Sequence, residues 1–312
     1  MRKATFIISF DCEGKWGMVD LSQNNSHIFS NERLNNAYSD INNIMKLYNI
    51  KGTFGFVGAF TMTQEEYYNN TDLFNELMIN NKPYLKSFLI DAENKIFEGW
   101  MNPKTLDIVR ANKNHEIASH SFSHLPLSES IIDQKTFLDE MNKMKKIMES
   151  KDVAISTLIY PRNKVGFTSE LSQFGIKGYR EDFFDGNSPL FGKTKSFMSE
   201  FNIFQKAQKH SKYQNPIKIP SGYFLNWRSH YRRKIPVSVT IKRWENIVKN
   251  AIQNNSVIHL WTHPHNFITG KNQFMLFEKI LKIVSEARNQ NKLNIMTQNE
   301  YCLSILNENT VY

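Results

Sequence analysis

The 312-residue sequence predicts an α/β protein with a parallel sheet that closes into a barrel of about seven β/α units. Short apolar runs of strand length alternate along the chain with longer segments whose apolar residues repeat at helical spacing. About seven such units occur, which favours a barrel over an open sheet. Polar residues follow several of the predicted strands, where the carboxyl ends of parallel strands form one face.

The predicted strands are apolar runs bounded by polar or turn-forming residues. The first run, "ATFIISF", stops at Asp11. In chain order the strands cover residues 4–10, 51–58, 115–119, 155–160, 175–179, 216–222 and 256–262, and a further run at 293–297 closes the pattern.

The predicted helices carry apolar residues at intervals of three and four. Proline 103 lies in the first turn of the second helix, a position that proline favours. The methionine-rich face of residues 133–150 is interpreted as core packing and not as a cofactor site. The helices cover residues 31–50, 102–113, 133–150, 168–174, 241–255 and 273–291.

Two stretches interrupt this alternation. Residues near 61–100 have a helical character of their own, and residues near 186–235 are aromatic and basic. No internal repeat and no low-complexity linker separates the chain into parts. We therefore expect one domain over residues 1–312 with two inserts.

Composition and charge argue against a nucleic-acid-binding protein, a disulfide-rich protein and a membrane-spanning protein. The net charge of +9 is compatible with an anionic partner, although solubility explains it equally well, and no dense basic run predicts nucleic-acid binding. Cys12 and Cys302 form neither a disulfide framework nor a zinc-finger pattern. The apolar run at the start is too short for a signal peptide, and no segment has the length of a membrane span. We expect a cytoplasmic protein, with basic residues 227–234 leaving open a peripheral contact with the inner membrane face.

Candidate functional residues follow four distant predicted strands. Because these strand ends share one face of a parallel barrel, we expect their side chains to converge. They are Asp11 and Glu13, His120 and His124, Arg162 and Asn163, and His263 and His265.

His120 and His124 are four residues apart and can chelate one cation from a helical turn. With one carboxylate they form a set of two histidines and one acid, which leaves positions open for water and substrate. The neighbouring "HEIASH" is not the zinc-protease motif, because His115 and His120 are five apart and the segment reads as a strand. His115 is therefore interpreted as structural.

The motifs "SFDCEG", "HSFSH", "YPRN" and "LWTH" resemble those of the polysaccharide deacetylases, the NodB-homology or carbohydrate esterase 4 group. The resemblance extends from near residue 5 to near residue 300 and leaves both inserts unmatched. It implies a distorted (β/α) barrel that removes N-acetyl, and sometimes O-acetyl, groups from sugars with a divalent metal ion, for which we favour zinc.

The resemblance also implies roles for individual residues. His120 and His124 would bind the metal together with Glu13, while Cys12 remains an alternative third ligand. Alternation along a strand favours Glu13, because residues 11 and 13 point the same way. Asp11 would then be the general base.

Three further roles concern residues around this centre. Arg162 would orient Asp11, and His263 would be the general acid. Asn163, Trp261 and His265 are expected to contact substrate. Pro161 precedes Arg162 here, whereas proline usually follows the arginine in this family, so the groove wall in this region departs from the pattern.

The chemistry of amide hydrolysis requires these groups. A Lewis acid must polarise the poorly electrophilic carbonyl, a carboxylate must accept a proton from water, and an acid must protonate the leaving amine. The expected substrate is an acetylated amino sugar of surface polysaccharide or lipopolysaccharide synthesis, lipid-linked or nucleotide-linked. The alternatives are an amide hydrolase acting on a small cyclic nitrogen compound and a non-catalytic glycan-binding relic.

Overall fold

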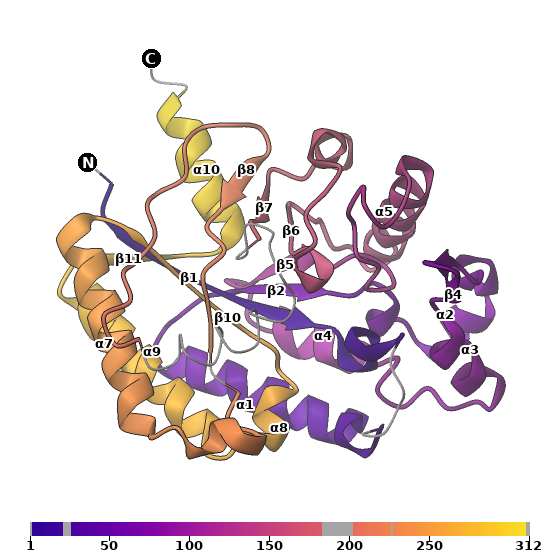
Figure 1. Cartoon of the computed structure of the whole chain (residues 1–312), viewed down its shortest axis with the longest axis horizontal. Helices are drawn as coiled ribbons and strands as arrows, with labels where there is room; N and C mark the ends of the chain where they lie inside the picture. The colour runs from indigo at the N-terminus through magenta and orange to yellow at the C-terminus, as the bar shows by residue number, and fades with distance from the viewer. Residues whose placement is uncertain (1, 21–25, 183–201, 226, 310–312) are drawn as a thin grey trace.

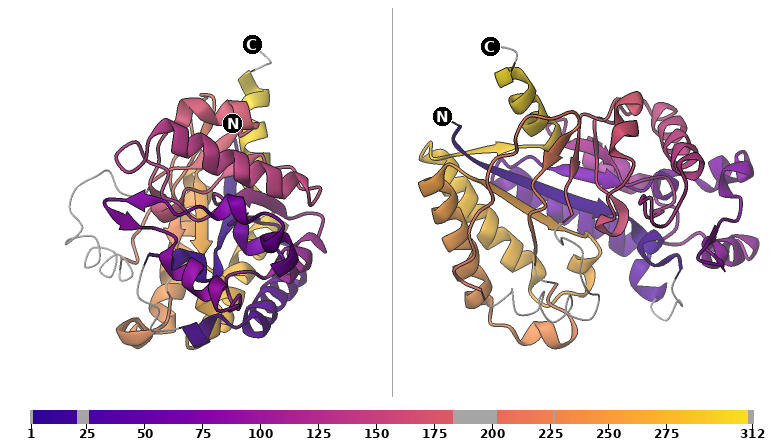
Figure 2. Two further views of the ribbon diagram at one scale, coloured as in Figure 1. Left: turned by 90° about the vertical axis from the view of Figure 1, so that its right-hand side faces the viewer. Right: turned by 45° about the horizontal axis from the view of Figure 1, so that its top comes forward.

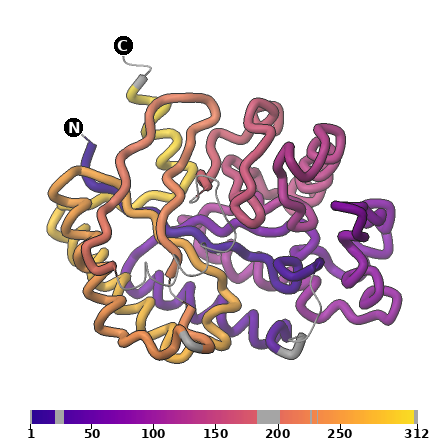
Figure 3. Tube along the Cα trace, in the orientation of Figure 1, coloured from indigo at the N-terminus to yellow at the C-terminus, as the bar shows by residue number. Residues whose placement is uncertain are grey.

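The computed structural model describes residues 2–20, 26–182, 202–225 and 227–309. Within them, parallel strands form a curled half-barrel with helices around it, which is a distorted (β/α) barrel (Figure 1). The first and last described residues lie on the same side of the molecule (Figure 3), where Arg2 and Glu308 form an ion pair of 2.5 Å. No helix among the described residues is long and apolar enough to cross a membrane.

The main sheet has the strand order β8-β7-β6-β5-β2-β1-β10-β9, and β11 also pairs with β1. Every pairing in this sheet is parallel. The strands are β1 Ala4–Cys12, β2 Thr53–Phe56, β5 Glu116–Ser119, β6 Thr157–Leu158, β7 Gly178–Arg180, β8 Ile217–Ile219, β9 Tyr223–Phe224, β10 Val257–Thr262 and β11 Leu293–Met296.

The chain itself requires this sheet to curl. The outer strands β8 and β9 are joined by only residues 220–222, a link that spans at most about 14 Å. Seven strand spacings would separate them by about 34 Å in a flat sheet. The two edges are therefore brought near each other, and the carboxyl ends of the strands face a common centre.

Strand β1 is the centre of the sheet, and all nine of its residues are buried. It pairs with β10 along one edge. Along the other edge, its first half pairs with β11 and its second half with β2. A strand buried on both faces is expected to be a continuous apolar run, which is why "ATFIISF" could be recognised in the sequence.

Helices pack on both sides of the sheet (Figure 2). Ser30 and Asp133 begin α1 and α5, because each side chain accepts a hydrogen bond from the backbone N–H three residues later. The longer helices are α1 Asn31–Leu47, α4 Pro103–Arg110, α5 Gln134–Glu149, α7 Val237–Asn254, α9 Gln273–Asn289 and α10 Gln298–Asn309.

The segment predicted as a first insert forms a compact set of short elements. They surround an aromatic cluster in which Trp16 lies against Phe88 and Trp100, with ring centroids 4.8 and 5.1 Å apart. The elements are the 3-10 helices η3 Ala59–Thr61 and η4 Thr71–Phe74, the helices α2 Gln64–Tyr68 and α3 Lys86–Glu93, and the hairpin strands β3 Met78–Ile79 and β4 Lys82–Pro83.

The predicted elements are present, with three differences. Residues 168–174 form a 3-10 helix instead of an α-helix, and α10 was not predicted. Strand β9 lies inside the segment predicted as a second insert, and it is the ninth strand of a sheet for which eight apolar runs were identified in the sequence. Residues 186–201 and 226 of that insert lie outside the described residues.

Candidate active site and metal centre

The end of β1 presents Asp11 and Glu13 to the same side and Cys12 to the other. The Cys12 thiol contacts the Phe10 carbonyl at 3.6 Å inside the core, and burial raises its pKa well above the ordinary value. A buried thiol that holds its proton is a poor metal ligand, because the thiolate is the ligating form. The geometry therefore favours Glu13, as the alternation of the strand predicts.

Glu13, His120 and His124 form a cluster whose ligand atoms all lie within 4.8 Å of one another. Glu13 Oε2 lies 3.4 Å from His120 Nε2 and 2.9 Å from His124 Nε2. His120 Nδ1 donates to the Ile159 carbonyl at 2.7 Å, which leaves Nε2 free to bind a cation. The donor set of two imidazoles and one carboxylate fits a divalent ion such as zinc.

The charges at this cluster also suit a cation. Burial alone would raise the pKa of Glu13, but His263, His124 and His120 hold it well below the ordinary value. Burial lowers the pKa of His124, although Glu13 opposes this effect. Glu13 is therefore ionised and His124 neutral near pH 7, which are the protonation states that metal ligands need.

The expectation that Arg162 pairs with Asp11 is wrong. Arg180, at the end of β7, contacts both oxygens of Asp11 at 2.7 and 2.8 Å. Arg162 instead forms an ion pair with Asp20. The physical reason is backbone geometry: Arg162 has a positive φ of 56° in the turn after Tyr160, and this conformation directs its side chain away from Asp11.

Arg180 is a candidate functional residue that was not predicted from the sequence. It follows the predicted strand at 175–179 directly, so the rule used for the other strands would have found it. Burial alone would raise the pKa of Asp11, but the guanidinium of Arg180 brings it below the ordinary value. Asp11 is therefore ionised, as a general base must be.

A chain of hydrogen bonds holds the guanidinium of Arg180 in place beside Asp11. Its guanidinium donates to Asn163 Oδ1 at 2.9 Å and to Ser9 Oγ at 3.3 Å. Ser9 in turn contacts His259 Nε2 at 2.8 Å, and His259 Nδ1 donates to the Pro220 carbonyl at 2.6 Å. Asn163, expected to contact substrate, thus binds Arg180.

His263, after β10, completes the centre. Its Nε2 lies 3.9 Å from Asp11 Oδ2 and 3.6 Å from Glu13 Oε1, and its side chain is 21% exposed. The ring of His265 stacks on that of His263, with centroids 4.9 Å apart. Trp261 lies beside His263 and covers the guanidinium of Arg180 at 4.7 Å. These residues form an aromatic wall next to the carboxylates.

His115 lies at the opposite end of β5 from His120. Its Nδ1 accepts a hydrogen bond from the Gly52 N–H at 3.1 Å, and burial lowers its pKa to about 4. This placement agrees with its interpretation as a structural histidine.

The fold and the site define a class of protein: a parallel half-barrel with a candidate metal cluster and a buried Asp–Arg pair at the carboxyl ends of its strands. This fold is that of the polysaccharide deacetylases. No protein-family model matches the sequence, and no curated protein matches it either.

Three solved structures illustrate the likeness. A protein from Mycobacterium smegmatis that is assigned to the polysaccharide deacetylases is 11% identical, with a TM-score of 0.60 over 99% of this chain and 92% of that chain. A second protein with this assignment, from Pseudomonas aeruginosa PAO1, is 11% identical, with a TM-score of 0.54 over 96% of this chain and 89% of that chain. The PuuE allantoinase is 11% identical, with a TM-score of 0.52 over 96% and 88%. At such identities the likeness concerns the fold.

Proposed function

We propose that this chain is a metal-dependent hydrolase that removes an acetyl group, N-acetyl in the first instance, from an amino sugar. One observation carries the proposal: the Asp11–Arg180 pair and His263 lie directly beside the cluster of Glu13 and two histidines. The polysaccharide deacetylases of the same fold support this reaction class. We assign it to one catalytic domain over residues 1–312.

Each group would have a distinct task. Asp11, held ionised by Arg180, would accept a proton from the attacking water at its carboxylate. His263 would donate a proton to the nitrogen of the departing amine. Glu13, His120 and His124 would hold a divalent metal, zinc in our assignment, which would polarise the acetyl carbonyl and lower the pKa of a bound water.

The aromatic wall suggests how a sugar is received. Trp261 and His265 are partly exposed beside His263, and aromatic faces suit the apolar faces of sugar rings. We propose a substrate of bacterial surface polysaccharide or lipopolysaccharide synthesis, carried on a lipid or a nucleotide in the cytoplasm. The basic residues 227–234 would serve a peripheral contact with the inner membrane face.

Acetate release provides the test. Purified protein, stripped of metal and reconstituted with zinc, would be assayed against free, nucleotide-linked and lipid-linked acetylated amino sugars. Zinc-dependent acetate release from one of them supports the proposal. No release from any carrier by protein that binds one zinc ion would contradict the substrate class but leave the metal site standing.

The allantoinase of the same fold favours a second candidate, hydrolysis of a small cyclic ureide. The same preparation would be assayed with a panel of cyclic ureides by following ring opening. Ring opening without acetate release would replace the sugar hypothesis. A protein that binds zinc but does neither reaction would point to the non-catalytic glycan-binding alternative.

A further inference from the structure

The loop that carries both candidate metal-binding histidines is held in two different ways. Its first three residues are held by backbone hydrogen bonds. The His120 N–H donates to the Phe56 carbonyl at 2.8 Å, and the carbonyls of Ser121 and Phe122 accept from residues 58 and 59 at 2.9 Å. The last two residues, Ser123 and His124, are held by side chains from other elements.

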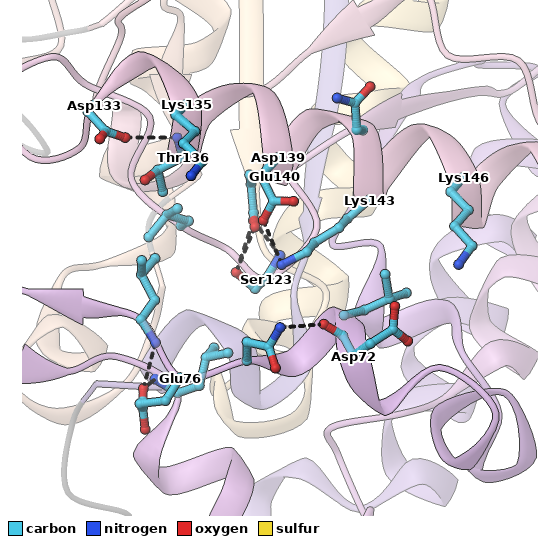
Figure 4. A pocket seen from close by; sticks show the side chains of 16 residues that line it. Asp72, Glu76, Ser123, Asp133, Lys135, Thr136, Asp139, Glu140, Lys143 and Lys146 are labelled. Carbon is cyan, nitrogen blue, oxygen red and sulfur yellow. Dashed lines mark hydrogen bonds and ion pairs between the residues drawn. The ribbon is translucent and has the colours of Figure 1, made fainter.

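Glu140 of α5 holds Ser123. One oxygen of its carboxylate accepts from the Ser123 N–H at 2.6 Å and from the Ser123 hydroxyl at 2.9 Å, and the other accepts from that hydroxyl at 3.1 Å (Figure 4). Glu140 is 5% exposed. Both residues line a pocket of about 610 Å³ between α5 and residues 72–85. The pocket leaves this side of Ser123 without closely packed neighbours, so the hydrogen bonds from Glu140 restrain Ser123 where close packing would otherwise do so.

Tyr84 holds His124. Its hydroxyl donates to the His124 carbonyl at 2.7 Å, and its ring is buried. Tyr84 belongs to residues 61–100, the segment that the family resemblance leaves unmatched. This hydrogen bond therefore joins residues 61–100 to the backbone of a candidate metal ligand.

His124 depends on such restraints more than His120 does. Its φ is 63°, a left-handed conformation that costs a residue other than glycine of the order of 1 kcal/mol. Its Nδ1 is buried and has no hydrogen-bond partner among the described residues, whereas His120 Nδ1 donates to a carbonyl. No partner at Nδ1 therefore helps to orient the His124 ring, whose Nε2 faces Glu13, so its direction depends strongly on the backbone that carries it.

We propose that Tyr84 and Glu140 are positioning residues that set the metal affinity of the centre by holding Ser123 and His124 in this left-handed turn. Neither contacts a ligand atom of the cluster or the reacting groups. The inference rests on the metal-binding part of the proposed function and is independent of the substrate. Partners that orient ligands in this way are typically worth a factor of about 10 to 100 in metal affinity.

The test measures metal affinity without turnover. Tyr84→Phe removes one tether, and Glu140→Gln weakens the other, because the amide keeps one acceptor oxygen for Ser123 but loses the negative charge and the second acceptor. The dissociation constants of both variants for Zn²⁺ would be measured by competition with a chelator. We expect each constant to rise about 10-fold to 100-fold. The visible absorption of the Co²⁺-loaded variants should also change, because the direction of the His124 ring alters the coordination geometry.

Two matched variants control for general loss of structure. Tyr223→Phe removes a buried tyrosine hydrogen bond of 2.6 Å to the Lys206 carbonyl. Glu116→Gln alters a carboxylate that binds Thr53, Thr157 and a backbone N–H at the other end of β5. Both should bind Zn²⁺ as the unaltered protein does, and thermal unfolding in chelator would confirm that all variants are folded.

Three outcomes would overturn the inference: unchanged Zn²⁺ affinity in folded Tyr84→Phe, an equal loss in the control variants, or no metal binding by the unaltered protein. If Glu140→Gln does not fold, Tyr84→Phe decides alone, since it removes one hydroxyl and keeps the ring. If the two variants lose Zn²⁺ affinity as expected but the unaltered protein releases no acetate, this inference stands and the proposed function is contradicted.

Discussion

Arg180 and Asp11 form a pair in which both partners are buried, with side chains 1% and 6% exposed. A bidentate guanidinium fixes the plane of the carboxylate as well as its charge. The Asp11 carboxylate lies 3.9 Å from His263 Nε2, so the base and the acid of the proposed reaction are neighbours beside the candidate metal centre.

Asp11→Asn should retain the metal and lose most activity, because the amide keeps the shape of the side chain but cannot accept the proton. Removing a general base typically costs about 10²-fold to 10⁴-fold. Turnover and bound zinc would be measured on the same sample. A variant that loses its zinc would show that Asp11 is itself a ligand and that the roles of Asp11 and Glu13 are exchanged.

The low pKa of Asp11 predicts the acid side of the pH profile. Activity should fall as the pH drops through that pKa, since protonated Asp11 cannot act as a base. Arg180→Met removes the charge that lowers this pKa, so the fall in kcat/KM should move to higher pH. Arg180→Lys should move it less, because it keeps the charge.

Arg162→Met is the matched control for that experiment, since Arg162 pairs with Asp20 and not with Asp11. In Arg162→Met, the fall in kcat/KM at low pH should occur at the same pH as in the unaltered protein. An equal displacement in both arginine variants would mean that Arg162 acts on the base after all.

His263 and His265 should differ in their contribution to activity. His263→Ala should abolish deacetylation with the metal retained, because His263 Nε2 lies 3.9 Å from Asp11 Oδ2 and 3.6 Å from Glu13 Oε1 and is the proposed proton donor. Burial and His263 lower the pKa of His265 to about 3, so His265 is neutral at working pH and cannot donate a proton as an imidazolium. His265→Ala should keep appreciable turnover. Equal loss of turnover in the two variants would argue against this assignment.

At the scale of elements, the 3-10 helix η1, Gly14–Met18, connects Glu13 to the segment predicted as the first insert. Trp16 is fully buried there, and its Nε1 donates to the Trp100 carbonyl at 2.7 Å. Gly14 has a φ of +50°, and a Cβ on it would collide with the Gly99 carbonyl and the ring of Phe60. The segment predicted as the first insert thus packs against Gly14, the residue that follows the candidate ligand Glu13.

Trp16→Ala should lower the free energy of unfolding by about 3 to 5 kcal/mol, the usual cost of removing a buried tryptophan side chain. It should also weaken Zn²⁺ binding, because Glu13 loses its support. Trp244→Ala on α7 removes an equally buried ring from another part of the core. Chemical denaturation should show a similar loss of stability in both variants. Chelator competition should show weakened Zn²⁺ binding only for Trp16→Ala.

At the scale of the whole molecule, Glu116 joins the bottom of the barrel to α10. Its carboxylate accepts from Thr53, from Thr157 and from the Asn299 N–H in the first turn of that helix. Burial raises the pKa of Glu116 despite these hydrogen bonds. The folded chain therefore binds the proton more tightly than the unfolded chain does.

The stability contributed by that proton is complete below the ordinary pKa of glutamate and is lost as the pH rises through the raised pKa. Glu116→Gln resembles the protonated acid at every pH. Its free energy of unfolding should therefore increase relative to that of the unaltered protein as the pH rises through this range. Denaturation of both proteins at several pH values would check this, and a constant difference between them would contradict it.

Much of this molecule follows from local sequence. The buried strands, the helices with regular apolar spacing and the capping residues Ser30 and Asp133 are determined by neighbours along the chain. The convergence of Asp11, Glu13, His120, His124 and His263 also follows, because every parallel strand delivers its following residues to the same face. The class of fold and the composition of the candidate centre could thus be predicted.

Only the tertiary structure decides the features that depend on where a side chain points or on which strands are neighbours in the sheet. Both Arg162 and Arg180 follow predicted strands, but which of them meets Asp11 depends on the left-handed backbone at Arg162 and on the place of β7 in the sheet. Strand β9 has two residues and pairs because β10 offers it an edge. The tethers from Tyr84 and Glu140 join residues far apart in sequence, where side-chain contacts arise only once the barrel has closed.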